Sequence, residues 1–285
     1  MSEAKRMEVN KRSHGWSARG IVNVLLVLGG VAAVFPLLWM LAVSFMAPGE
    51  ASHFPPPLLP RQPTLANYRT LFAVAGIGRY FLNSLLLAGG ATLLSLLFNV
   101  GAGYAFAKLH FRGREKLFRM LLGALVIPGQ VAMLPLFLML KQLGLVNSMA
   151  GVLIPSAASI FGIFLVRQYA LTIPDALLEA ARLDGAGELR IFRSIVLPLL
   201  APILVTLALF SFLGSWNDFM WPLIVLTDKD MYTLPVALAA LSNEHVQDNE
   251  MMMAGSVLTI VPVLLIFLGL QRYYLQGLTM GSVKG

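Results

Sequence analysis

The chain has 285 residues, of which 58% are hydrophobic and only 12% are charged. Soluble domains average about 25% charged residues, so this composition places the chain in the membrane class. Cysteine is absent from the sequence, which excludes disulfides, thiol nucleophiles and thiolate metal sites. The formal net charge of +7 is compatible with nucleic-acid binding, but the distribution of the basic residues along the chain favours membrane orientation instead.

Six apolar segments predict an all-α polytopic membrane protein. A helix crosses about 30 Å of hydrocarbon at about 1.5 Å per residue, and each segment is read as one crossing. We expect six transmembrane helices at about 21–46, 81–107, 117–140, 150–166, 198–226 and 253–270. The first is too long for the apolar core of a cleaved signal peptide, so we interpret it as a retained span.

Two of the predicted spans carry features that constrain their packing. Pro128-Gly129, with Pro135 beyond them, should break or kink the third span. The second span contains small residues that permit close helix approach in lipid, namely Gly89, Gly90, Gly101 and Gly103. Its polar members, Asn83 and Asn99, are each expected to form a side-chain hydrogen bond with a neighbouring helix.

The segments outside the spans are polar. We expect a basic tail at 1–20, a proline-rich outer loop at 47–80 with a short amphipathic helix between Thr64 and Tyr80, an acidic outer loop at 227–252, and a tail at 276–285. Six spans with the N-terminus inside place most of the 21 basic residues in the cytoplasm. The positive-inside bias therefore predicts cytoplasmic termini and a cytoplasmic location for residues 169–198.

The connection at 169–198 predicts a helix–turn–helix. Pro174 suits the first position of a short helix, where its missing N–H costs nothing. Helix-forming residues run to Asp184, and Gly185 supplies a permissive turn residue. A second amphipathic stretch follows from Glu188 to Val196 and leads into Leu197-Pro198.

This connection resembles the EAA signature of ABC-importer permeases. The matching residues, together with the acid before the glycine, are Glu179, Ala180, Ala181, Asp184, Gly185, Ile195, Leu197 and Pro198. Other stretches, AGYAFAKLHFRGRE, LPLFLMLKQLGLVNS, SWNDFMWPLIVL and QRYYLQGLTMGSVKG, are similar to the sugar-importer branch. Together they resemble the shorter, six-span permease subunit of maltose-type importers.

The resemblance implies a type I importer permease fold, with a permease core at 81–275, in a bacterial or archaeal plasma membrane. Its implied partners are a second permease subunit, two ATPase subunits, an extracytoplasmic solute-binding protein, a sugar and membrane lipid, and not nucleic acid. The chain lacks a Gly-Lys-Ser/Thr sequence and hence an ATPase phosphate loop. It should therefore be a transport subunit with no catalytic residue, metal or cofactor of its own, and the ATP is hydrolysed by the partners.

The resemblance also assigns roles. Glu179 is the expected ion-pair partner of a basic residue on the ATPase, Ala180 and Ala181 keep the docking face flat, and Gly185 turns the chain. Pro198 marks the return to the membrane. In the fifth span, Trp216, Asn217 and Asp218 are candidates for the substrate path, because an intramembrane acid is a functional hypothesis by default. Interfacial Trp residues, such as Trp221, suit a plain membrane-boundary role equally well.

Two other classes compete with this interpretation. An ion-coupled secondary transporter would need several intramembrane ionisable residues, and Asp218 is nearly alone. An intramembrane hydrolase would need a nucleophile with a base or a metal site, and the four histidines are widely separated outside the spans. The sequence leaves open which sugar is carried, and whether the 227–252 loop and the C-terminal tail contact partners or are plain solvated segments.

Overall fold

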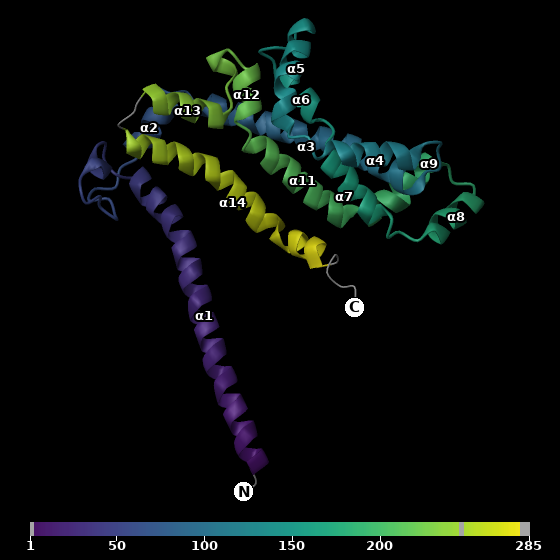
Figure 1. Ribbon diagram of the computed structural model, residues 1–285. Helices are drawn as coiled ribbons and strands as arrows, with labels where there is room; N and C mark the ends of the chain where they lie inside the picture. The colour runs from purple at the N-terminus through teal and green to yellow at the C-terminus, as the bar shows by residue number, and fades with distance from the viewer. Residues whose placement is uncertain (1–2, 245–247, 280–285) are drawn as a thin grey trace. The chain divides into compact units, whose positions relative to one another are not determined.

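The computed structural model describes residues 3–244 and 248–279, and all regular secondary structure in this part of the chain is helical (Figure 1). The longer helices are α1 (Glu3–Ser44), α3 (Ile77–Lys108), α4 (Arg114–Ala124), α5 (Gly129–Gln142), α7 (Ile160–Ala170), α11 (Ala201–Trp216), α13 (Leu234–Glu244) and α14 (Asn249–Thr279). The shorter helices are α2 (Ala66–Ala73), α6 (Met149–Ser156), α8 (Asp175–Leu183), α9 (Glu188–Ile191), α10 (Leu197–Leu199) and α12 (Met220–Val225). Two 3-10 turns, η1 (Glu50–Ser52) and η3 (Lys229–Met231), and one π-helical turn, η2 (Phe192–Val196), complete the set.

Three single helices and three bent pairs are long and apolar enough to cross a membrane. The single helices are Gly20–Ser44, Ile77–Lys108 and Asn249–Gln271. The pairs are Arg114–Ala124 with Gly129–Gln142, Met149–Ser156 with Ile160–Ala170, and Glu188–Leu199 with Ala201–Trp216. If each pair is one span, the described residues give six spans, which is the number that the sequence predicts.

The chain divides into two compact units. The first comprises Met1–Val74 and His245–Leu258, and the second comprises Ala75–Glu244 and Thr259–Gly285. In the first unit, α1 begins at Glu3, so the helix includes most of the predicted tail. Its apolar side chains, such as Leu26 at 68% exposure, are suited to lipid contact.

Hydrogen bonds fix the chain just after α1 in the first unit. Asn67 on α2 donates to the carbonyls of Ser44 and Met46 at 3.0 and 2.8 Å. The carboxylate of Glu250 accepts from the Ala51 amide at 2.6 Å. The helix predicted between Thr64 and Tyr80 forms only at 66–73, because α3 already begins at Ile77.

In the second unit, α3 packs against both α7 and α11 (Figure 1). The approach to α7 is closest at Gly103, where an added Cβ would lie 2.6 Å from the Cβ of Val166. No heavy atom outside its own helix lies within 4 Å of the corresponding position at Gly101. The prediction that glycines permit close helix packing therefore applies to Gly103, and also to Gly90 beside Leu153.

Both polar residues of the second predicted span form side-chain hydrogen bonds, Asn99 with the start of helix α7 as predicted and Asn83 with the 3-10 turn η3 and the residue after it. Asn83 donates to the carbonyls of Asp230 and Tyr232, each at 3.0 Å. The Asn99 carbonyl accepts from the Ser159 amide at 2.9 Å, at the start of α7. Buried amides need such partners, and Asn99 thereby ties α3 to the junction between α6 and α7.

The predicted break in the third span is confirmed, since α4 and α5 meet at 101° around Pro128. The 41° bend between α6 and α7 was not predicted. It follows Pro155 and ends where Ser159 caps α7 by accepting from the Gly162 amide at 3.0 Å.

The fifth span differs from its predicted range of 198–226. Its long helix, α11, ends at Trp216, and residues 217–219 separate it from α12. Pro222 has no N–H to donate and its ring would clash with the Asp218 carbonyl in a continuous helix, so the helix breaks here. Asp218 instead accepts from the Trp221 amide at 3.3 Å.

The predicted outer loop at 227–252 is partly helical. It contains η3, α13 and the first residues of α14, and Leu234, Val236 and Ala237 on α13 are buried. Its acidic residues indicated a loop, and the apolar run at 234–241 was too short to be recognised as a helix.

At the C-terminal end of the chain, α14 reaches Thr279, so residues 276–279 of the predicted tail are helical. Residues 280–285 lie outside the described part.

The close contact at Gly103 gives a stability prediction. Alanine in place of glycine inside a helix gains about 1 kcal/mol of helix propensity, but an overpacked contact costs about 1–3 kcal/mol. We therefore expect Gly103→Ala to lower the melting temperature of the purified chain in detergent and Gly101→Ala to leave it unchanged or raise it. Equal melting temperatures for the two variants would show that the α3–α7 contact is not tight.

Candidate functional site

The first candidate site is the EAA bend, which we define as residues 174–198. Its first helix, α8, starts at Asp175 with Pro174 in the N-cap position, one residue earlier than predicted for the proline. The helix ends at Leu183, with Asp184 as its C-cap, as the helix-forming run predicted. The second arm consists of α9, the π-helical turn η2 and α10.

The turn between the two arms depends on Gly185. This residue has φ of +81°, in the left-handed region that glycine adopts without strain. Its amide donates to the Arg182 carbonyl and the Ala186 amide donates to the Ala181 carbonyl, both at 3.0 Å. These are the two bonds of a Schellman motif, so the predicted turn role of Gly185 has a specific geometry.

Lys108, the last residue of α3, fixes the start of the bend. Its ammonium group donates to the Ile173 carbonyl and to a carboxylate oxygen of Asp175, both at 2.6 Å. The Lys108 side chain is only 4% exposed. The hydrogen bond and charge of Lys108 hold the pKa of the Asp175 carboxyl below its usual value. The sequence analysis missed this contact, because it assigned no partner to Lys108.

Glu188 links the two arms of the bend to α3. One carboxylate oxygen of Glu188 pairs with Arg182 on α8 at 2.7 Å. The other accepts a hydrogen bond from the hydroxyl of Tyr104 on α3 at 3.1 Å. The first helix of the bend, the second helix and α3 therefore meet at one carboxylate.

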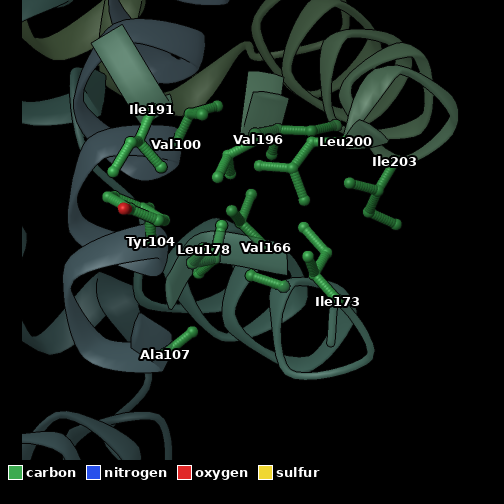
Figure 2. Close-up of a cluster of buried hydrophobic side chains, with 12 residues drawn as sticks. Val100, Tyr104, Ala107, Val166, Ile173, Leu178, Ile191, Val196, Leu200 and Ile203 are labelled. Atoms are coloured by element: carbon green, nitrogen blue, oxygen red, sulfur yellow. The ribbon is translucent and has the colours of Figure 1, made fainter. Parts of the chain in front are cut away.

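The inner face of the bend is apolar. Leu178 and Ile191, one from each arm, are buried together with Val196 against Tyr104 and Val166 (Figure 2). Burying a leucine or isoleucine side chain stabilises by about 1.5–3 kcal/mol, so this cluster holds the bend against α3 and α7.

The outer face carries the predicted residues. Glu179, Ala180, Asp184, Gly185 and Pro198 are exposed, whereas Ala181, Ile195 and Leu197 are half-buried against the apolar cluster. Two leucines that the sequence reasoning did not single out are also exposed there, Leu183 at 89% and Leu189 at 63%. Isolated exposed leucines are common, but these two flank the Gly185 turn, and Leu183 lies one helical turn after Glu179 on α8.

The sharp change of direction between the bend and the apolar helix α11 comes two residues after Pro198, and the return to the membrane at Pro198 stays a prediction. Residues Glu188–Leu199 meet α11 at 78°, around Leu200. Pro198 cannot donate an amide bond to the preceding turn, which is consistent with the π-helical geometry at Phe192–Val196.

The second candidate site is a pocket of about 350 Å³ in the second unit, which we call the polar pocket for its serines and Asp218 although most of its lining is apolar. Its polar lining consists of Asp218 and five serines, Ser95, Ser156, Ser159, Ser211 and Ser215. Ser95 on α3 and Ser211 on α11 lie 2.7 Å apart through their hydroxyls, so both helices contribute to one hydrogen-bonded wall. Such a cavity can accept and donate hydrogen bonds to a hydroxyl-rich ligand.

The three residues predicted for the substrate path occupy different environments. Asp218 lines the pocket. Trp216 is 1% exposed, donates to the Thr259 carbonyl at 3.0 Å and stacks on Phe212, so its ring belongs to the core. Asn217 is exposed and donates to the Leu213 carbonyl at 2.9 Å. Among the described residues no group of three His, Asp or Glu side chains could hold a metal ion.

The described residues combine up to six candidate membrane spans with a helix–turn–helix. Residues 15–279 match the family described as binding-protein-dependent transport system inner membrane component, and the chain belongs to this family. It is therefore an inner-membrane permease subunit and not an enzyme, as the sequence predicted.

Named relatives confirm the resemblance to the carbohydrate branch. The chain is 41% identical over 276 residues to the arabinooligosaccharides transport system permease protein AraQ of Halalkalibacterium halodurans, covering 93% of this chain and 98% of that protein. It is 34% identical to the diacetylchitobiose uptake system permease protein NgcG of Streptomyces coelicolor, covering 93% and 88%. The fold matches a chain of a bacterial ABC transporter involved in the import of the acidic polysaccharide alginate, with a TM-score of 0.81, 25% identity, and coverage of 96% and 99%.

The positive φ at Gly185 predicts a local effect of substitution. A side chain with a Cβ costs about 1–2 kcal/mol in this conformation. Gly185→Val should therefore speed amide hydrogen exchange at residues 185–186 by about tenfold or more. Gly187 has φ of −70° and open space around its Cβ position, so Gly187→Val is the matched control and should leave exchange unchanged. Equal protection in both variants would contradict the strained-turn argument.

Proposed function

We propose that this chain forms the translocation path of an ATP-driven sugar importer together with a second permease subunit. Its EAA bend docks on cytoplasmic ATPase subunits, which hydrolyse the ATP, and an extracytoplasmic binding protein delivers the sugar. The observation that carries this proposal is the shape of the bend, with an apolar inner face packed on α3 and α7 and an outer face that exposes Glu179 and Ala180.

The docking role follows from the chemistry of the outer face. Leu183 and Leu189 offer apolar contact on either side of the Gly185 turn, and Glu179 offers a carboxylate within the same surface. A basic residue on the ATPase would pair with Glu179, and leaving one charge of such a buried pair without its partner costs a few kcal/mol. In this arrangement Ala180 permits close approach, and Asp184 and Gly185 set the turn between the arms.

The topology that accompanies docking has six spans with both termini in the cytoplasm. Residues 1–20 and 276–285 are then cytoplasmic tails, and 47–80 is an outer loop. The permease core extends from 81 to 275, and its connection at 169–198, which contains the bend, lies on the cytoplasmic side. The distribution of basic residues supports this orientation. The substrate class is supported by the sugar-transport names of the relatives.

One reconstitution tests the proposal against its rival, a single-subunit secondary transporter. The tagged chain is expressed with its candidate partner subunits, and purified complexes are placed in vesicles with the binding protein and ATP. We expect a second permease and an ATPase to copurify, and uptake to require ATP. Uptake by the chain alone under an ion gradient, or labelling of the bend from the outer side, would reject the proposal.

Reversing the charge of Glu179 should uncouple transport. In Glu179→Lys the exposed position remains in a folded bend, but the docking surface now repels a basic partner. A loss of a few kcal/mol of binding free energy between the bend and the ATPase corresponds to at least a tenfold fall in ATP-driven uptake. The variant chain should still reach the membrane. The control is Lys116→Glu, an exposed charge reversal outside the bend, which should keep wild-type uptake. Wild-type uptake in Glu179→Lys would refute the docking role.

The polar pocket is our candidate for the sugar path through this subunit. Asp218 and the surrounding serine hydroxyls combine a charged acceptor with groups that both donate and accept. This is the chemistry that matches a ring of sugar hydroxyls. Asn217 is exposed and Trp216 is packed in the core, so neither supports the pocket proposal, and their roles in the path stay predictions.

Neutralising Asp218 should weaken uptake without disturbing assembly. A hydrogen bond to a charged group contributes about 1.5–3 kcal/mol, so Asp218→Asn should lower the ratio kcat/KM for sugar uptake by about tenfold to a hundredfold. Asp228→Asn is the control, because Asp228 lies outside the pocket lining and asparagine keeps the acceptor for the Asp230 amide. If the two variants transport alike, the pocket is not on the sugar path.

A further inference from the structure

We propose that Lys108 is a positioning residue for energy coupling. It fixes the start of the EAA bend to the end of α3, so that movement of the bend is transmitted to the helix that lines the polar pocket. The inference rests on the proposed docking of the bend to the ATPase. It assigns the transmission to one contact, in which the Lys108 side chain is buried and the Asp175 side chain is 75% exposed.

The contact itself is unusual for a lysine. Lysine is among the residues that are rarely fully buried, because removing its charge from water is costly unless it is paired. Lys108 is 4% exposed, and its ammonium group has two acceptors at 2.6 Å, the Ile173 carbonyl and the Asp175 carboxylate. One acceptor precedes Pro174 and the other is the first residue of α8, so the two bonds hold both sides of the entry to the bend.

Helix α3 joins this contact to the pocket. Ser95, which lines the pocket, and Lys108 lie on the same unbroken helix, about 20 Å apart at 1.5 Å per residue. Between them, Asn99 bonds to the start of α7 and Gly103 packs against Val166. Tyr104 lies one turn before Lys108 and bonds to Glu188 at the start of α9. Residues four apart share a helix face, so one face of α3 bonds to the beginning of both arms of the bend.

The apolar cluster under the bend cannot replace these bonds. Hydrophobic contact is non-directional and tolerates sliding of one surface over another, whereas a hydrogen bond weakens steeply when its geometry changes. The cluster therefore keeps the bend attached, and Lys108, together with the Tyr104–Glu188 bond, determines its register on α3. Removing Lys108 should leave an attached bend whose movement is poorly transmitted.

The test uses the complete complex in vesicles and measures sugar molecules transported per ATP hydrolysed. Lys108→Met keeps the aliphatic stem and removes the donors. Asp175→Asn keeps an acceptor but removes the charge. Lys116→Met removes an exposed lysine from the neighbouring segment and is the matched control. Basal ATPase rate and the amount of assembled complex are recorded for each variant.

We expect Lys108→Met to lower the sugar-to-ATP ratio at least tenfold, Asp175→Asn to lower it about threefold, and Lys116→Met to leave it unchanged. Assembly and basal ATPase rate should stay within about twofold of the wild type. A wild-type sugar-to-ATP ratio in Lys108→Met overturns the inference. The inference is also overturned if assembly, basal ATPase rate and uptake all fall together while the ratio stays at the wild-type value. If Lys108→Met does not assemble, Asp175→Asn decides, because a wild-type ratio there overturns the inference and a lowered ratio supports it.

Glu179→Lys in the same assay separates the two hypotheses. Wild-type coupling in Glu179→Lys rejects docking of the bend itself, and with it the basis of the Lys108 inference. Uncoupling by Glu179→Lys together with wild-type coupling in Lys108→Met rejects the role of Lys108 alone.

Discussion

The second unit depends on the close approach of α3 and α7 at Gly103. Because no side chain separates the helices there, Val166 packs directly on the α3 backbone. The same approach places Ser159 at the start of α7 beside Asn99, and places Ile173 beyond the end of α7 beside Lys108. Gly162 on α7 is equally close to α3, since an added Cβ there would lie 2.5 Å from Nδ2 of Asn99. These two glycines therefore permit the polar contacts of the interface, and the contacts shape the pocket and the bend.

The two candidate sites share a helix but differ in character. The pocket is formed where helices break, at the α6–α7 junction and at the end of α11, and its polar groups are hydroxyls and one carboxylate. Breaks in apolar helices free backbone and side-chain groups that need partners, which is why polar chemistry concentrates at such places. The bend, in contrast, is a helix–turn–helix whose outer face exposes Glu179, Ala180 and the Arg182–Glu188 pair.

Much of this organisation could be predicted from the sequence because it depends on local rules. Apolar segment length gave six spans, Pro128 gave the break in the third, and the glycine after a helix-forming run gave the turn at Gly185. Features that depend on tertiary contacts could not be predicted in this way. Nothing near Lys108 in the sequence indicates that its ammonium group donates to the Ile173 carbonyl. Likewise, nothing near Trp216 indicates that its indole N–H donates to the Thr259 carbonyl. The break after Trp216 was foreseeable from Pro222, whose effect four residues upstream was overlooked.

The Schellman turn at Gly185 has a thermodynamic consequence for recognition. Its two backbone bonds are made within the chain, so the proposed docking surface is already ordered before another protein arrives. Ordering a flexible segment costs about 1–2 kcal/mol per residue, and a partner that meets this rigid surface avoids that loss of entropy. A small contact area can then give adequate affinity, and the two proteins can separate without either having to unfold.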